Sequence, residues 1–118
     1  MKQFLAIFIG SDSGPAAKKW NALSEEKRNE LTREGKSGWM NWVTKNQSSM
    51  TNPGSPLGKT KQVNASGISD TKNQMCAFTI VQAESHEAAA KLFINHPHFA
   101  IFPGDAVEIM ECMPIPGM

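Results

Sequence analysis

The stretch MCAFTIVQAESHEAAAKLFINHPHFAIFPGDAVEIMECM, residues 75–113, decides the fold of this chain. Residues 76–81 are apolar and rich in β-branched side chains, so they predict a strand. Ser85 is a typical N-cap, and we expect a helix from Ser85 through Asn95 that Pro97 ends. Residues 106–112 predict a second strand. A helix that joins two strands in this way is a right-handed crossover, so the two strands should be parallel.

The N-terminal half predicts a further strand and several helices. Residues 3–9 are apolar without alternation, which is typical of a central strand. Pro15 suits the first position of a helix over 16–23. A second helix should begin after Ser24, with Glu25 and Glu26 in its first turn, and end at a Gly35 C-cap; a short third helix should start near Gly38.

The middle of the chain predicts a loop and then an edge strand. Residues 51–56 are dense in turn formers, which favours a loop. The Lys-rich stretch 58–63 is polar, as an exposed sheet edge is, and should pair antiparallel with 75–83. We expect residues 64–73 to connect these two strands.

This order of elements predicts an α+β fold of the ferredoxin-like, split βαβ type. Its four-stranded antiparallel sheet should have the order 4-1-3-2. The apolar runs would lie in the centre, and strands with Lys59, Lys61, Glu108 and Glu111 at the edges. At 118 residues the chain fits a single domain, 1–118, in which 15–36 is an extra helical region.

The predicted sheet implies a homodimer. Both helical layers pack on one face, so the other face would expose about half of the apolar side chains of residues 4–9 and 76–83. A bare apolar surface of that size is unusual on a soluble monomer. We therefore expect a homodimer through the open sheet face.

Charge and composition exclude two classes of partner. A net charge of +1 argues against nucleic acid, and the longest apolar run, 4–9, is far shorter than the ~20 residues of a membrane span. The same run is too short for a signal peptide. Cys76 and Cys112 lie in predicted strands, so we expect buried, reduced thiols in a cytoplasmic protein; a disulfide between strands is the alternative.

Several segments, in their order, resemble the YCII-related, or DGPF-domain, family. Residues 70–83, DTKNQMCAFTIVQA, resemble the strand-three region of that family: an acidic residue, Thr-Lys, a spacer, and a β-run. Residues 39–42 (WMNW) and 52–58 (NPGSPLG) resemble the tryptophan helix and Gly-x-Pro-Leu-Gly turn of one branch. Residues 106–109 resemble the closing Val-Glu-Val pattern. The resemblance covers Gly38 to Ile115 and the first strand.

The resemblance implies a dimeric α+β barrel, the arrangement that the strand pattern also favours. Two features depart from the family. Ala65-Ser66-Gly67-Ile68 stands where the name-giving Asp-Gly-Pro-Phe would align, so no role of that aspartate carries over. A His–Asp pair has been suggested as the catalytic centre of some YCII-like proteins, and no motif places it here.

His96-Pro97-His98 is the polar cluster that most suggests chemistry. Alternate residues of an extended segment point the same way, so the imidazoles could meet at a metal or substrate, with Asp105 nearby in sequence. Alternatively, His96 ends the preceding helix and interacts with its free carbonyls. A metal would need more ligands, and His86 is roughly 15 Å away along the helix. We expect no metal.

Trp39 and Trp42 are the candidate ligand-binding residues. With Val43 they form one apolar helical face, which would line a pocket between helix and sheet or simply belong to the core. Asp70 and Lys72 are expected to be a surface pair. Residues 10–14 lack the Lys of a P-loop, and no nucleophile motif is present, so we expect no cofactor.

Three functions are therefore compared. The first is a small-molecule binding or regulatory module. The second is a histidine-dependent lyase or isomerase acting on a small polar metabolite, which would require His96 or His98 beside a carboxylate in a pocket. The third is a protein-interaction module that binds through residues 59–63.

Overall fold

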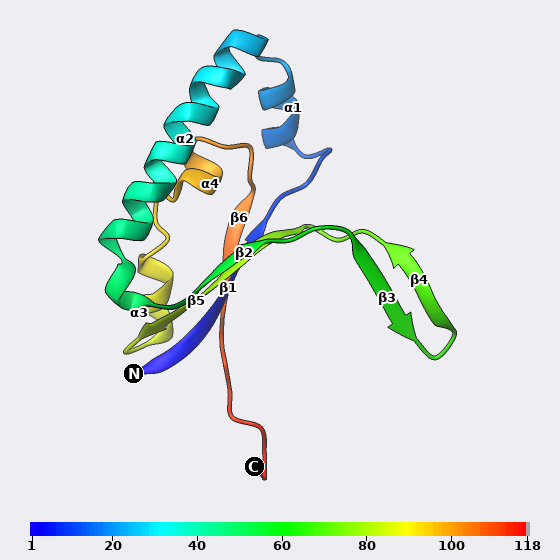
Figure 1. The fold of residues 1–118 in the computed structure, drawn as a ribbon, viewed down its shortest axis with the longest axis vertical. Coiled ribbons are helices and arrows are strands. Elements are labelled where there is room, and N and C mark those ends of the chain that lie inside the picture. The colour runs from blue at the N-terminus through cyan, green and yellow to red at the C-terminus, as the bar shows by residue number, and fades with distance from the viewer. Residues whose placement is uncertain (118) are drawn as a thin grey trace.

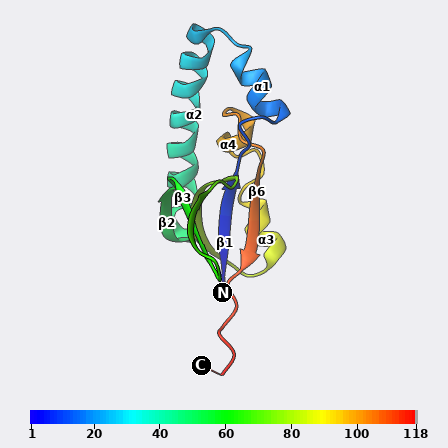
Figure 2. The ribbon, with the colours of Figure 1, turned by 90° about the vertical axis from the view of Figure 1, so that its right-hand side faces the viewer.

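The structure, a computed structural model, describes residues 1–117. Its centre is a four-stranded antiparallel sheet in which β2 (Met50–Pro56), β5 (Met75–Ala83), β1 (Lys2–Ile9) and β6 (Ala106–Glu111) lie side by side in that order. The helices lie on one side of this sheet, as Figures 1 and 2 show. The fold class is therefore α+β, and the apolar runs β1 and β5 occupy the centre of the sheet, as expected.

The helical elements are α1 (Pro15–Asn21), α2 (Glu25–Lys45), α3 (His86–Lys91) and α4 (Pro97–Ala100), with a short 3₁₀ turn, η1 (Gln47–Ser49). Pro15 and Pro97 occupy first helical positions, where a missing N–H costs nothing. The Ser24 and Ser85 hydroxyls accept hydrogen bonds from Lys27 N and Ala88 N and cap α2 and α3. The starts of α1, α2 and α3 were predicted correctly, whereas Pro97 was expected to end a helix and instead begins one.

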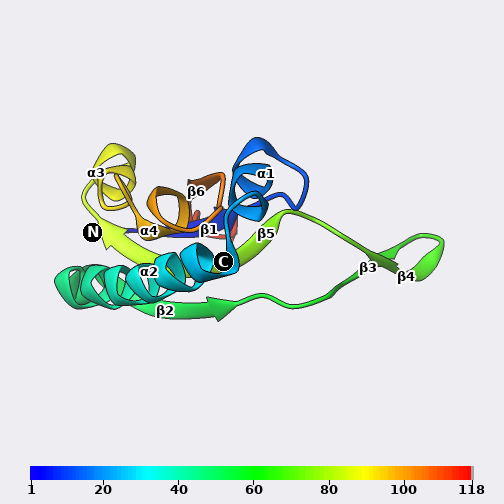
Figure 3. The ribbon, with the colours of Figure 1, turned by 90° about the horizontal axis from the view of Figure 1, so that it is seen from above.

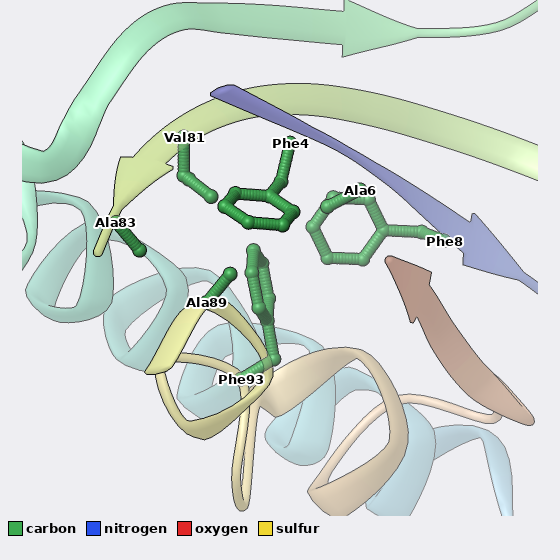
Figure 4. Packing of buried hydrophobic residues seen from close by; sticks show 7 residues of the cluster. All are labelled: Phe4, Ala6, Phe8, Val81, Ala83, Ala89 and Phe93. Atoms are coloured by element: carbon green, nitrogen blue, oxygen red, sulfur yellow. The ribbon is translucent and has the colours of Figure 1, made fainter. Parts of the chain in front are cut away.

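The core lies between the covered face of the sheet and the helices. Alternate β1 residues, Phe4, Ala6 and Phe8, are buried there, and the residues between them are only partly covered. Figure 4 shows how this strand meets the helices and β5 in one apolar cluster, formed by Phe4, Ala6, Phe8, Val81, Ala83, Ala89 and Phe93. The opposite face of the sheet carries no helix.

The edge strand beside β5 is β2, Met50–Pro56, so the prediction of a loop at 51–56 is wrong. The turn residues make this strand irregular: its register shifts twice. Gly54 has φ +70°, its N–H donates to Asn52 Oδ1 at 2.9 Å, and the Asn52 carbonyl accepts from Thr79 Oγ1 at 2.9 Å. The turn formers thus build bulges within a strand instead of ending it.

Residues 58–63 do not form the sheet edge, so that prediction is also wrong. β3 (Thr60–Asn64) pairs antiparallel with β4 (Gly67–Thr71) in a separate hairpin, which we call the arm. The expected connection at 64–73 therefore contains a strand. The arm extends beyond the end of the sheet, well away from the body (Figures 1 and 3). Asp70 pairs across it with Lys61, at 2.7 Å, and not with Lys72.

α2 is one helix of 21 residues, so the C-cap predicted at Gly35 and the separate helix from Gly38 are wrong. These glycines permit close packing instead of ending the helix. A Cβ at Gly35 would lie 2.4 Å from ring atoms of Phe102, and one at Gly38 would lie 3.2 Å from Pro97 Cγ. Tertiary contact therefore overrides the usual meaning of a helical glycine.

The predicted helix from Ser85 through Asn95 is too long. α3 ends at Lys91, a turn follows, and Asn95 has φ +58°. His96 then begins α4: its Nδ1 accepts a hydrogen bond from His98 N at 3.0 Å. The expectation that His96 would interact with the carboxyl end of the preceding helix is therefore wrong, because Pro97 starts a new helix directly after the turn.

Both cysteines are free, but they are exposed and not buried as predicted: Cys76 is the second residue of β5, and Cys112 follows the last residue of β6. In residues 1–117, no helix combines the length and apolar character that crossing a membrane requires.

Candidate functional site

A cavity of about 680 Å³ lies between α2 and the β2–β5 edge of the sheet. The α2 side contributes Trp39 and Trp42, as the sequence suggested, and Val43 from the same helical face. The sheet contributes Phe8 and Phe78, and His98 comes from α4. The remaining lining residues are Lys36, Met40, Met50, Pro53, Gly54, Ser55, Pro56, Cys76, Ala77, Thr79 and Phe102.

Aromatic packing positions the cavity wall. The indole of Trp42 donates from Nε1 to the Leu92 carbonyl at 2.7 Å, and its ring centroid lies 5.0 Å from that of Phe93. Trp39 lies 5.0 Å from Phe8, between centroids. Both tryptophans thus pack on the core and also border the cavity. The two roles considered for them, pocket lining and core packing, are both present.

His98 is held in one orientation. Its Nε2 lies 2.7 Å from the Ile9 carbonyl oxygen, and its ring lies over Gly104, where a Cβ would be 2.3 Å from Nε2. A carbonyl oxygen only accepts, so Nε2 carries a proton, and Nδ1 is the ring nitrogen that can accept a hydrogen bond. His98 is buried yet borders the cavity. The site therefore has a fixed hydrogen-bond acceptor among apolar walls.

His96 is buried behind the cavity wall. Since Nδ1 accepts from His98 N, Nε2 carries the proton of the neutral ring. Within residues 1–117, His96 Nε2 is the buried side-chain polar atom without a hydrogen-bond partner. Rings of Trp39, Trp42 and Phe8 surround it at centroid distances of 4.5, 4.8 and 5.0 Å. Burial, and to a lesser extent the charge of His98 when that ring is protonated, lower the pKa of His96 to about 4, so His96 is neutral at pH 7.

A smaller, more polar cavity of about 390 Å³ lies on the other side of His98. Cys76 and Phe102 also border both cavities. Although Cys76 as a residue is exposed, partial burial of its thiol raises the pKa of that thiol, and the charges of Asp12 and Asp105 also raise it. The thiol is therefore protonated at neutral pH, whereas a nucleophilic cysteine needs the thiolate.

The structure does not unite the other candidates at this site. Asp105 Oδ2 accepts from Ser11 N at 2.8 Å, and none of the three ion pairs in residues 1–117 includes a histidine. His86 stacks on Phe4 at 5.4 Å and lies 2.7 Å from the Ile109 carbonyl oxygen. The described residues contain no group of three His, Cys, Asp or Glu side chains that could hold a metal.

Several lining residues were not anticipated from the sequence. The turn formers at 53–56 predict a loop, so the sequence does not indicate that these residues line the cavity. Phe8 read only as a core position of a central strand. Two glycines could have indicated rings at this site, because a glycine allows a ring to approach the backbone closely. Phe102 packs in this way on Gly35, and His98 on Gly104.

No family model matches the chain, and no curated protein matches it. Among solved structures it is similar to 5-chloro-2-hydroxyhydroquinone dehydrochlorinase (TftG) from Burkholderia phenoliruptrix AC1100, solved with 2,5-dihydroxybenzoquinone. The TM-score is 0.50 at 13% identity, over 94% of this chain and 93% of that one. At this identity the likeness shows a shared fold of the α+β barrel type. A hypothetical Arabidopsis thaliana protein, At3g17210, matches at 20% identity with a TM-score of 0.38, over 99% and 90% of the chains.

Proposed function

We propose that this protein binds a small, planar, hydroxylated molecule in the cavity between α2 and the β2–β5 edge. The observation that carries the proposal is the imidazole of His98, which borders a cavity with aromatic walls and is oriented by the Nε2 contact to Ile9, so that Nδ1 is its acceptor atom. Ligand sites are typically concave and apolar, with a few placed polar groups.

The lining defines the ligand chemistry. Aromatic faces favour a flat ring, and the His98 acceptor favours a ligand group that donates, such as a phenol or enol O–H. Lys36, an exposed residue of the cavity rim, favours a partial or full negative charge on the opposite end of the ligand. Hydroxylated aromatic compounds meet all three requirements. The shared fold with TftG, whose complex contains 2,5-dihydroxybenzoquinone, supports this ligand class.

The test uses matched ligands and matched variants. We would titrate hydroquinone, 4-hydroxybenzoate and 2,5-dihydroxybenzoquinone, with 1,4-dimethoxybenzene as the analogue without a donor, by calorimetry and thermal shift. A hydroxylated ligand should bind and the dimethoxy analogue should bind at least tenfold more weakly. His98→Leu, which removes the acceptor, should abolish this preference, whereas His86→Leu, remote from the cavity, should keep it. If no hydroxylated compound binds, or both kinds bind equally, the proposal is wrong.

A second candidate is a histidine-dependent enzyme of the lyase or isomerase type. The same acceptor atom, His98 Nδ1, can take a proton from a bound ligand. The carboxylate partner expected from the sequence is missing from the three ion pairs of residues 1–117, so His98 would act as the base without one. TftG, by its name, is a dehydrochlorinase. Chloride release from 5-chloro-2-hydroxyhydroquinone, lost in His98→Gln and retained in His86→Gln, would support this candidate. Binding without chloride release would leave the binding module as the function.

The proposal includes a homodimer, membership of the YCII-related family and a cytoplasmic location. The open sheet face, which carries partly covered apolar side chains such as Ile7 and Ile80, supports the homodimer. The α+β barrel-type fold and the residues that resemble the family support membership. Free thiols at Cys76 and Cys112 suit a reducing compartment.

A further inference from the structure

The arm is a two-stranded hairpin whose strands have little contact with the rest of their own subunit. Residues 61–64 and 67–71, nearly the whole of its two strands, are exposed. An isolated two-stranded hairpin is at best marginally stable in water. Such an element normally packs on another surface, and its own subunit does not provide one.

The arm is amphipathic, which shows the side on which a partner would pack. Val63 is paired with Ile68, so their side chains lie on the same side of the hairpin, and they are 75% and 73% exposed. The neighbouring pair, Gln62 and Ser69, points to the other side. One side of the arm therefore carries an exposed apolar pair beside the Lys61–Asp70 ion pair, and the other side carries uncharged polar side chains.

The arm also lies in the right place to meet a second copy. It bends to the side of the sheet away from the helices, where the open apolar face lies (Figure 1). A copy packed against that face would lie within the concave space between sheet and arm. A second copy can therefore provide the surface on which the arm packs, without a different protein.

Charge indicates which part of the second copy the arm would contact. Residues 58–74 contain three lysines and one aspartate, and the rest of the chain contains nine basic and ten acidic residues. Two arms would repel each other, whereas an arm and the body attract weakly. Glu108, exposed on β6, pairs with Ile7 and so lies on the open face. A two-fold axis parallel to the strands would bring the partner's arm over this β6 edge.

We propose that the arm of each subunit packs against the body of a second copy, with Val63 and Ile68 in the contact. The inference rests on the proposed homodimer and adds to it an exchanged element. Residues 59–63, which the sequence suggested as a binding site for another protein, would then bind a second copy of this chain.

The first experiment measures dimer dissociation by sedimentation equilibrium. Val63→Ser/Ile68→Ser should raise the dimer Kd at least tenfold, because exposed apolar area in the interface is lost. Gln62→Ser/Ser69→Thr, on the opposite side of the arm, should change it less than twofold. A dimer Kd that is unchanged in the first variant overturns the arm contact but leaves the homodimer intact. A wild-type chain that stays monomeric at high concentration overturns both.

The second experiment separates arm–body from arm–arm contact and does not rely on point variants. In one chain, residues 60–71 are replaced by a Gly-Ser-Gly linker, and circular dichroism checks its fold. If each arm contacts the partner's body, a heterodimer of the armless and wild-type chains keeps one contact, and its Kd is intermediate between those of the two homodimers. A heterodimer as weak as the armless homodimer overturns the proposal, since arms would then contact each other.

Discussion

His96 shows how one buried side chain links local structure to pH. It caps α4 through Nδ1, and its protonated Nε2 faces only aromatic rings. An aromatic ring face accepts an N–H only weakly. The cap of α4 by His96 Nδ1 is therefore kept although the Nε2–H donor of the same ring has no full hydrogen bond, which costs stability. Charging this ring would require a second proton, on the nitrogen that accepts from His98 N. Burial of the ring, and then the charge of His98, lower its pKa to about 4.

The stability of the protein should therefore fall in acid. In the unfolded chain His96 has its ordinary pKa, near 6.5, and in the folded chain about 4, so the unfolded state binds more protons between these values. The contribution is complete above pH 6.5 and is lost as pH falls towards 4, up to about 3 kcal/mol. Urea unfolding at pH 7, 6, 5 and 4.5 measures it.

His96→Asn is the control for this prediction. Asparagine keeps a cap acceptor but does not titrate, so the variant should be less stable at pH 7 and show a smaller loss of stability towards pH 4.5. If the variant and the wild-type lose the same free energy of unfolding over this range, His96 does not cause the acid sensitivity.

Gly54 is the residue on which the shape of β2 depends. Its φ of +70° is strained for any side chain, and a Cβ there would lie 1.7 Å from the Phe78 carbonyl oxygen, a backbone atom that cannot turn away. Gly54→Ala should destabilise the protein by about 2 kcal/mol or more.

Gly58→Ala is the matched control for Gly54→Ala, because a Cβ at Gly58 meets nothing within 4 Å. Its melting temperature should stay close to that of the wild-type. Equal melting temperatures for the Gly54 and Gly58 variants would show that β2 does not need this conformation.

At the scale of elements, the sequence predicted apolar periodicity well and glycine-rich and turn-rich segments poorly. β1, β5 and β6 follow from their side chains, and Ser24 and Ser85 mark helix starts by a local hydrogen bond. Gly35 and residues 51–56 were misassigned because contacts from distant segments decide their structure. A ring packed on a glycine, or a carbonyl accepting from Thr79, leaves no trace in the neighbouring sequence.

The cavity was predictable to the same degree. The spacing of Trp39 and Trp42 placed them on one helical face, and both border it. His98 was a candidate from its motif, but its orientation depends on the Ile9 carbonyl, 89 residues away in the chain. A sequence pattern gives residue types on a face, and the hydrogen bonds that orient them come from the tertiary fold.

The continuity of α2 gives a prediction at this scale. Gly35→Ala gains helix propensity of about 1 kcal/mol, but its Cβ would lie 2.4 Å from Phe102 and must displace a ring that borders both cavities. We expect a net loss of stability of about 1–2 kcal/mol and a changed ligand affinity. Ser37→Ala, on an exposed position of the same helix, should change neither. Unchanged ligand binding in the Gly35 variant would show that Phe102 does not shape the cavity.

At the scale of the whole molecule, the sheet has one face covered by helices and one open. Paired residues of antiparallel strands share a face, so Leu5 and Ile80 lie together on the open side. The ligand cavity lies on the covered side, where Trp39 and His98 belong. Ligand binding and self-association can therefore be altered separately by substitutions on opposite faces of the same strands.

Ile80→Lys tests this division. Lysine in the middle of the open face would place a charge in the proposed interface, where burial without a partner is costly, so the dimer Kd should rise at least 100-fold, by about 3 kcal/mol. The affinity for a hydroxylated ligand should stay within about twofold if each cavity is complete within one subunit. Asn29→Lys, the same change of charge on an exposed position of α2, should alter neither quantity. Sedimentation equilibrium and calorimetry on the same samples measure both.

A variant that remains as tight a dimer as the wild-type would rule out the open face as the interface. A monomeric variant that no longer binds ligand would instead place part of the partner subunit at the cavity.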